Sequence, residues 1–334
     1  MSEPKEGRAW KPKLLSSSLP LEFEAAKILV ANGYSVHSDY SYHRVSQGRE
    51  AEFSVDLRGI RVTSAPRGAK RGCTFDLLVE CKFRTRQIQW LFVPELNMHY
   101  STASEHEIVR GIDAFSSWFL TENSWWTTQS PLPVCYKGVE VDVASGYVEP
   151  EELRRGIMQL QCAIPPLIRS RIEAPITSFG VDDSTPFFFS TVLVTNAPLL
   201  VASSAFSPAS VESTKNFAEL GQQANCLVLR TPPSQDVLRH SQLQFAGFAE
   251  VATRKGIQAV ESHRKSQGVH AWELPKSLSE RLQTSGSELE AVTDVSCILV
   301  CSLPYLATLV RELARVCERV GSAATRELPE HLRV

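Results

Sequence analysis

The segment FDLLVECKF, residues 75–83, places a glutamate and a lysine inside an apolar run that is typical of a buried β-strand. Side chains alternate between the two faces of a strand, so Glu80 and Lys82 are expected on one face and Val79 and Cys81 on the other. Burying a charge in such a strand is costly unless the charge is paired or bound to a metal. The segment therefore predicts a charged site inside a sheet.

A second carboxylate lies in an earlier segment. Residues 53–57, FSVDL, alternate apolar and polar side chains with a period of two, which predicts a strand that carries Asp56. Gly59 and the tract 65–72, which contains Gly and Pro, predict a long turn between this strand and the next. Asp56 and Glu80 are therefore expected to lie on neighbouring strands.

Two carboxylates on neighbouring strands form a site of hard oxygen ligands that suits Mg²⁺ or Mn²⁺. Such an ion can polarise a phosphoryl oxygen and lower the pKa of a bound water. Lys82 would then hold or help to deprotonate the attacking water, or neutralise charge on the phosphorus. Together, Asp56, Glu80 and Lys82 predict metal-dependent hydrolysis of a phosphodiester bond. The alternative is a structural ion pair between Glu80 and Lys82.

The apolar pattern along the rest of the chain predicts an α/β protein with a central mixed sheet flanked by helices. The expected helices cover residues 21–32, 105–120, 149–172 and 305–320, and the expected strands cover residues 53–57, 75–83, 88–93, 187–194, 225–229 and 295–303. The stretch around Trp125 and Trp126 is expected to form a loop with a short hairpin.

The domain organisation is expected to have three parts. These are a flexible leader over residues 1–18, a core over residues 19–205 that can carry insertions, and an α/β extension over residues 206–334. The apolar run of residues 187–202 could complete the sheet of the core, so the extension can equally belong to the same domain. A chain of 334 residues accommodates one large domain or two smaller ones.

Composition narrows the class of protein. The net charge of −2 and the pI of about 6.5 argue against a uniformly basic protein, so contact with a polyanion needs a local patch. The eight cysteines show no CxxC spacing, which favours a reducing, cytoplasmic location. No segment reaches the ~20 apolar residues of a membrane helix. The sequence has no Walker, GxGxxG or GxSxG motif, which argues against the common NTPase, dinucleotide-binding and α/β-hydrolase classes.

Basic residues cluster beside the expected site. No acidic residue occurs between Leu57 and Phe75. The candidate contacts to nucleic acid are Arg58, Arg61, Arg67, Lys70, Arg71 and, after the Glu80–Lys82 triplet, Arg84. A basic loop flanked by glycines could grip the backbone of DNA or RNA. A solvated hairpin tip explains the same residues equally well.

Three segments resemble, in their order, the Mrr-like branch of the PD-(D/E)xK, or restriction-endonuclease-like, nucleases. They are LEFEAAKILVANGYSV (residues 21–36), FSVDLRG (53–59) and FDLLVECKFR (75–84). The resemblance covers about residues 19–95. It implies a restriction-endonuclease-like core with a C-terminal elaboration.

The resemblance also implies roles for individual residues. Glu22 corresponds to the acid on the first helix, Asp56 to the motif aspartate, and Glu80 and Lys82 to the (D/E)xK triplet. Glu24 competes with Glu22 for the role of the helix acid. The chain departs from the branch in its long insert between the two strands, and no obvious Gln follows the triplet.

The function implied by the resemblance is that of an endonuclease that acts on DNA with Mg²⁺ or Mn²⁺, in restriction or antiphage defence by analogy with the family. Two alternatives stay open: a catalytically inactive binding or scaffold protein with the nuclease fold, and a nuclease that acts on RNA. Because the pI argues against tight promiscuous binding to DNA, we expect activation by a protein partner or by formation of a homo-oligomer.

Overall fold

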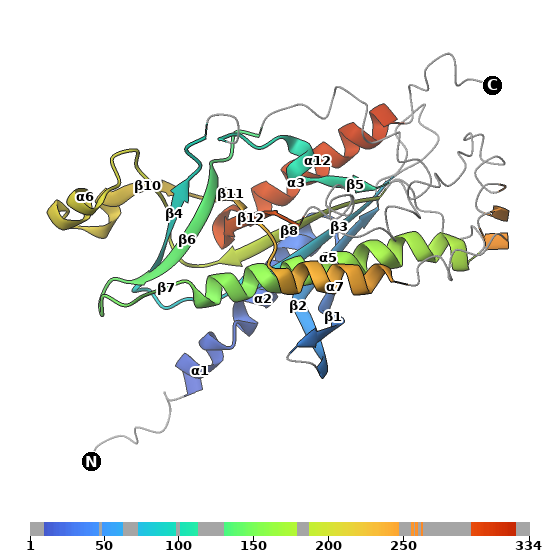
Figure 1. The fold of residues 1–334 in the computed structure, drawn as a ribbon, viewed down its shortest axis with the longest axis horizontal. Helices are drawn as coiled ribbons and strands as arrows, with labels where there is room; N and C mark the ends of the chain where they lie inside the picture. The colour runs from blue at the N-terminus through green and yellow to red at the C-terminus, as the bar shows by residue number, and fades with distance from the viewer. Residues whose placement is uncertain are drawn as a thin grey trace.

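A twelve-stranded mixed sheet forms the centre of the computed structural model (Figure 1). The structure describes residues 10–46, 49–62, 73–97, 101–112, 130–178, 187–246, 255–256, 258–259, 262 and 295–324. The strands are β1 (Ser35–Ser46), β2 (Arg49–Val62), β3 (Thr74–Lys82), β4 (Ile88–Pro94), β5 (Arg110–Ile112), β6 (Val134–Asp142), β7 (Val148–Glu149), β8 (Phe187–Thr195), β9 (Leu199–Ala202), β10 (Gly221–Ala224), β11 (Cys226–Arg230) and β12 (Cys297–Ser302).

The strands follow the order β1-β2-β3-β8-β12-β11-β6-β4-β9-β10, with β5 beside β8 and β7 beside β6. Strands β3, β8 and β12 run parallel to one another, whereas β1, β2 and β3 form an antiparallel meander. The described helices are α1 (Trp10–Ser16), α2 (Leu19–Ala31), α3 (Glu105–Ile108), α5 (Glu151–Thr177), α6 (Pro208–Ser213), α7 (Gln235–Phe245) and α12 (Leu306–Ala324), with 3-10 turns η3 (Phe217–Leu220) and η4 (Leu303–Tyr305). The predicted α/β class with a mixed sheet is confirmed.

Helices cover the two faces of this sheet in two apolar layers. On one face α5 and α7 bury side chains such as Leu160 and Phe245 against Leu78 of β3 and Leu193 of β8. On the other face α2 and α12 pack against Leu77, Val79 and Cys81 of β3 and against the neighbouring strands. Strand β3 is therefore covered on both sides, which explains its nearly unbroken apolar sequence.

Helix α2 begins two residues before and ends one residue before the bounds predicted for it, residues 21–32. Pro20 occupies its first turn, where a missing backbone N–H is tolerated. The chain leaves the helix through Gly33, whose φ of +82° lies in the left-handed region that favours glycine. The strands expected at residues 53–57, 75–83, 88–93, 187–194, 225–229 and 295–303, and the helices expected at 149–172 and 305–320, are confirmed with bounds that shift by a few residues.

The helix predicted over residues 105–120 is wrong in its length. A capping box between Ser104 and Glu107 starts helix α3, but the helix ends at Ile108 and Val109 is extended. Strand β5 follows immediately and pairs antiparallel with β8. Pairing with the central strand outweighs the local helical pattern here, as tertiary contacts commonly do. The hairpin expected around Trp125 and Trp126 lies outside the described residues.

The sheet joins the two expected halves of the chain. Strands β11 and β12 come from the part of the chain after residue 205. They lie in the sheet between β8 and β6, which both come from the part before residue 205. Of the expected leader, residues 1–9 lie outside the described part, and Trp10–Ser16 forms helix α1 without a buried residue. All eight cysteines are buried thiols, and none forms a disulfide. In the part of the chain that the structure describes, every helix is too short or too polar to span a membrane.

Candidate functional site

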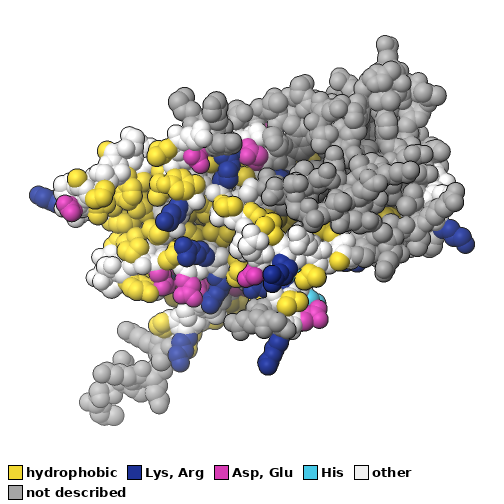
Figure 2. All heavy atoms as spheres, in the orientation of Figure 1, with side chains coloured by type: hydrophobic (Ala, Val, Ile, Leu, Met, Phe, Trp, Pro, Cys, Tyr) yellow, Lys and Arg dark blue, Asp and Glu magenta, His cyan; other side chains and the backbone are white. Residues whose placement is uncertain are grey.

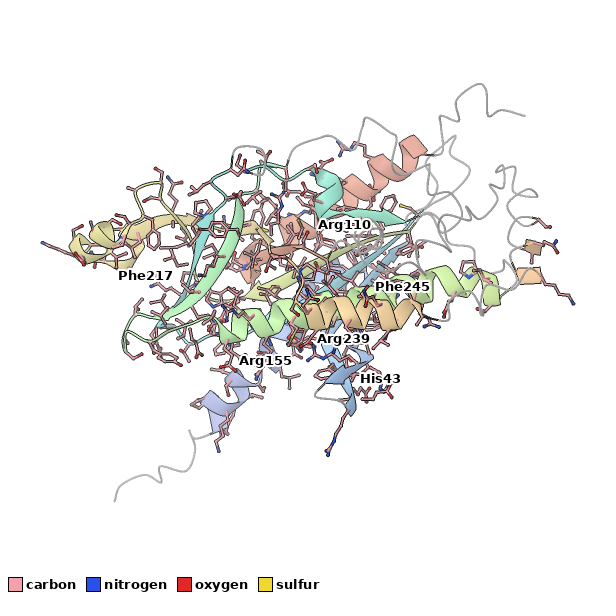
Figure 3. All side chains as sticks on the ribbon, viewed as in Figure 1. His43, Arg110, Arg155, Phe217, Arg239 and Phe245 are labelled. Carbon is pink, nitrogen blue, oxygen red and sulfur yellow. The ribbon has the colours of Figure 1, made fainter. Side chains whose placement is uncertain are left out.

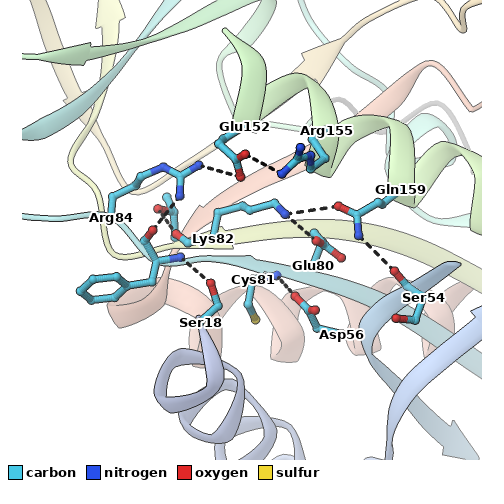
Figure 4. A network of polar contacts seen from close by, with 12 residues as sticks. Ser18, Ser54, Asp56, Glu80, Cys81, Lys82, Arg84, Glu152, Arg155 and Gln159 are labelled. Carbon is cyan, nitrogen blue, oxygen red and sulfur yellow. Dashed lines mark hydrogen bonds and ion pairs between the residues drawn. The ribbon is translucent and has the colours of Figure 1, made fainter. Parts of the chain in front are cut away.

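Strand β3 presents Glu80 and Lys82 on the same face, as its period-two pattern predicts (Figure 4). The Lys82 Nζ lies 2.8 Å from Glu80 Oε1, and the Glu80 side chain is only 2% exposed. Cys81 lies on the opposite face, in the apolar layer under α2 and α12. The charged face of β3 is thus turned towards α5, and its two charges form a buried pair.

Asp56 lies beside this pair because strands β2 and β3 separate at this level. Their ladder ends at the pair Leu57 and Val79, and one further step in register would place Asp56 opposite Glu80. Beyond this pair, the side chain of Asp56 replaces a backbone carbonyl as the acceptor for β3. Its Oδ2 accepts a hydrogen bond of 2.6 Å from the backbone N–H of Cys81 (Figure 4). This bond fixes the carboxylate in the opening between the strands.

Glu22 brings a third acid to the opening from the first turn of α2. Partial burial, then the charges of Asp56 and Asp39, raise the pKa of Glu22 to about 7, and Lys82 acts in the opposite direction. Glu24 lies on the exposed side of the helix, 3.5 Å from Lys27. Glu22 is therefore the helix acid that faces the site.

The start of α2 is tied to the end of β3. Ser18, which precedes the helix with a φ of 62°, accepts a hydrogen bond on its Oγ from the backbone N–H of Phe83 at 3.2 Å. Because Phe83 directly follows Lys82, this bond holds the first turn of α2 next to the charged end of the strand. The hydrogen bond between Ser18 and Phe83 thus explains how Glu22, on a helix, comes close to acids that lie on two strands.

Gln159 of α5 is a polar member of the site that the sequence analysis missed (Figure 4). Its Oε1 accepts a hydrogen bond of 3.2 Å from Lys82 Nζ, and its Nε2 donates to the backbone oxygen of Ser54 at 3.1 Å. Gln159 thereby bridges β3 and β2 across the opening. The helical pattern of residues 149–172 gives no sign of which side chain reaches Lys82.

A glycine allows α5 to lie this close. A Cβ on Gly156 would come within 2.7 Å of Leu193 Cδ1 and 3.1 Å of Lys82 Cε. A larger side chain at this position would have to displace Leu193 of β8 and would press on the lysine stem. Gly156 and Gln159, three residues apart on one helix face, therefore set the depth and direction of Lys82.

The carboxylates of the site oppose one another electrostatically. Burial, then the charge of Asp56, raise the pKa of Glu80 to about 7, although Lys82 lowers it. Burial is also the largest cause that raises the pKa of Asp56. The folded chain thus binds protons at these groups more tightly than the unfolded chain. Their ionisation destabilises the fold progressively as the pH rises from the ordinary carboxyl range towards about 7.

One oxygen of the site lacks a compensating contact. Glu80 Oε1 pairs with Lys82, whereas Oε2 is buried and has no hydrogen-bond partner. A buried carboxylate oxygen without a partner is costly, so it indicates a missing positive group or donor at this position.

The structure gives three of the six basic candidates partners within the chain. Arg58 binds Asp76, Arg61 binds Glu318 and the backbone oxygen of Asn32, and Arg84 binds Glu140 and Glu152. Their side chains are mostly buried and neutralised, which leaves them poorly placed to grip a phosphate backbone. Arg67, Lys70 and Arg71 lie outside the described residues.

Asp76 lies on the same face of β3 as Glu80 but has a different role. It is fully buried, and its two oxygens accept from two arginines. Arg58 contacts Oδ1 at 2.6 and 2.7 Å, and Arg171 of α5 contacts Oδ2 at 2.7 and 2.8 Å. Asp76 is an anchor between the sheet and α5.

The surface around the site carries both signs of charge. Glu152 of α5 binds Arg155 at 2.8 Å and Arg84 at 3.5 Å. Arg155 extends from α5 with about half of its side chain exposed (Figure 3). Acidic and basic side chains are intermixed where α5 begins, while hydrophobic ones gather over the lobe of β4, β6 and β10 (Figure 2).

The carboxylates of the site are not arranged as a complete set of metal ligands. Within the described ranges, no three His, Cys, Asp or Glu side chains are placed so that they could hold a metal ion. The charge of Asp56 contributes to raising the pKa of both Glu80 and Glu22, but Glu80 is turned to Lys82. Binding a cation would require these carboxylates to draw together. No protein-family model, no curated protein and no solved structure matches this chain.

Proposed function

We propose that this protein is a metal-dependent nuclease of the PD-(D/E)xK type that hydrolyses phosphodiester bonds, with DNA as its substrate. One observation carries the proposal. Asp56 and Glu80, from adjoining strands, come together where the ladder of β2 and β3 ends, with Lys82 beside Glu80 and Glu22 reaching Asp56 from α2. Three acids and one ammonium from three elements are more than a structural ion pair needs.

The donor set fits Mg²⁺ or Mn²⁺. Carboxylate oxygens are the ligands that these hard cations prefer, and the unpartnered Glu80 Oε2 offers one that nothing else uses. Asp56, Glu80 and Glu22 would hold the ion. When bound, such an ion polarises a phosphoryl oxygen and lowers the pKa of water. It would also offset the burial of these acids and the repulsion from Asp56, which together raise the pKa of Glu80 and Glu22.

The contacts of Lys82 orient its ammonium so that it can interact with the phosphate. Its ammonium is fixed from two sides, by Glu80 Oε1 and by Gln159 Oε1, and its stem is confined under Gly156. An ammonium has three N–H donors, so a third direction is left for a phosphoryl oxygen or for the attacking water. Preorganised positive charge of this kind stabilises charge that develops on the phosphate during hydrolysis. Gln159 acts as a positioning residue for Lys82.

A second candidate function is binding without turnover. The closed Glu80–Lys82 pair is consistent with a purely structural role for both residues, and so is the lack of a three-residue metal group among the residues that the structure describes. Such a protein would keep the nuclease fold as a scaffold for nucleic acid or protein. It would bind without any dependence on divalent metal.

Digestion assays separate these functions. Plasmid DNA, single-stranded DNA and RNA are each incubated with the full chain in Mg²⁺, in Mn²⁺ or in EDTA. The proposal expects plasmid DNA to be nicked or cut with a divalent metal and to stay intact in EDTA. Cleavage of RNA alone would replace DNA as the substrate. Metal-independent binding to any of the three without cleavage would favour the scaffold function.

A further inference from the structure

Asp39 of β1 faces Asp56 across a gap in the sheet. Strands β1 and β2 pair from Ser35 to Ser46, and the register joins Ser38 to Leu57 and Tyr40 to Val55. Asp39 lies between these pairs, directly opposite Asp56, and it is the one residue of β1 without a partner in the ladder. Two like charges in directly opposed positions destabilise an antiparallel pair.

The backbone of Asp39 departs from its strand at this point. Its φ is +53°, a left-handed conformation that residues other than glycine adopt rarely and that Asp and Asn tolerate best. The ladder resumes on both sides in the same register, so the departure is confined to one residue. The side chain of Asp39 is thereby released from the regular alternation of the strand.

Asp39 acts on the acids of the candidate site. The register places Asp39 opposite Asp56, and the charge of Asp39 contributes to raising the pKa of both Asp56 and Glu22. On the other side of Asp56, Glu80 Oε2 is buried without a hydrogen-bond partner, and the charge of Asp56 contributes to raising the pKa of Glu80. Asp56 is thus the centre of an acidic group that extends from β3 across β2 to β1. The cationic side chain beside this group is Lys82, which pairs with Glu80.

We propose that Asp39 is a fourth carboxylate of the metal site and helps to hold the divalent cation from the β1 side. The inference rests on the proposed function, because it assigns one more ligand to the same cation. The strained backbone and the opposed charges are tolerated because the bound ion offsets them. The edge hairpin of β1 and β2 is then part of the site and not only a flank of the sheet.

Calorimetric titration of the full chain with MnCl₂ tests this assignment. The Asp39→Asn variant removes the charge but keeps a residue that tolerates the left-handed conformation, and Asp39→Gly removes the carboxylate and relaxes the backbone. Both are expected to weaken the affinity for Mn²⁺ by about tenfold or more, in line with the loss of a group that holds a metal. The Glu52→Gln variant is the matched control, because it removes an exposed acid from β2 four residues before Asp56.

The outcomes separate the two levels of the proposal. A loss of affinity in both Asp39 variants, with less than a twofold change in Glu52→Gln, supports the assignment. Wild-type affinity in both Asp39 variants, together with loss in Asp56→Asn, overturns the role of Asp39 and leaves the proposed function in place. A wild-type chain that binds no Mn²⁺ overturns both.

Discussion

Replacing Lys82 with Met is expected to lower the rate of metal-dependent DNA cleavage by about 10²–10³-fold, the loss typical of removing one preorganised group that stabilises the transition state. Met keeps an unbranched stem of similar length, so the packing of the side chain under Gly156 is retained. What disappears is the ammonium that Glu80 and Gln159 hold in place. The rate is measured on supercoiled plasmid under single-turnover conditions, with folding checked by circular dichroism.

Lys27→Met provides the matched control for this variant. Lys27 is an exposed lysine on α2, five residues after Glu22, and it contacts Glu24 and the ring of Phe23 on the helix surface. Its loss removes the same charge near the site without touching the opening between β2 and β3. Cleavage that persists in Lys82→Met at the rate of Lys27→Met would remove Lys82 from the proposed chemistry.

Replacing Asp76 with Ala is expected to destabilise the fold by about 3–5 kcal/mol, the range observed when one partner of a buried ion pair is removed. Asp76 is fully buried, and its loss would leave the guanidinium groups of Arg58 and Arg171 without their anion. It would also free α5 from the start of β3. The free energy of unfolding is measured by denaturant titration.

Asp76→Asn gives the graded comparison. The amide keeps the shape and one oxygen acceptor but loses the charge, so a smaller loss of stability is expected than with Ala. Glu50→Gln, at an exposed glutamate of β2, serves as the control for a loss of charge alone. A change below about 1 kcal/mol in Asp76→Ala would contradict the role of Asp76 as an anchor between β3 and α5.

The parts of the site that the sequence predicts are those that depend on local pattern. The apolar run of β3 fixes its identity as a buried strand, and the period of two then places Glu80 and Lys82 on one face. Asp56 follows because its strand comes next to β3 through a single connection. Glu22 was placed by resemblance alone, and the tie between Ser18 and Phe83 supplies its physical reason.

The parts that the sequence could not supply depend on contacts between distant segments. Gln159 reaches Lys82 only because α5 docks across β3 with Gly156 at the contact. Asp39 meets Asp56 through a strand register that no local pattern displays. The three arginines taken as contacts to nucleic acid have acidic partners elsewhere in the fold; for Arg61 the partner is Glu318, 257 residues away. The charged residues of a sequence do not by themselves show which of them form ion pairs in the fold.

The central claim is that Asp56 and Glu80 share a divalent cation, and titration of the apo protein with Mn²⁺ tests it most directly. Asp56→Asn is the decisive variant, because an amide oxygen can still accept the hydrogen bond from the backbone of Cys81 while the charge is gone. We predict that the wild-type chain releases or absorbs heat on a saturable binding isotherm and that Asp56→Asn loses it. Saturable binding that is equally strong in Asp56→Asn, or no binding by the wild-type chain, would contradict the claim.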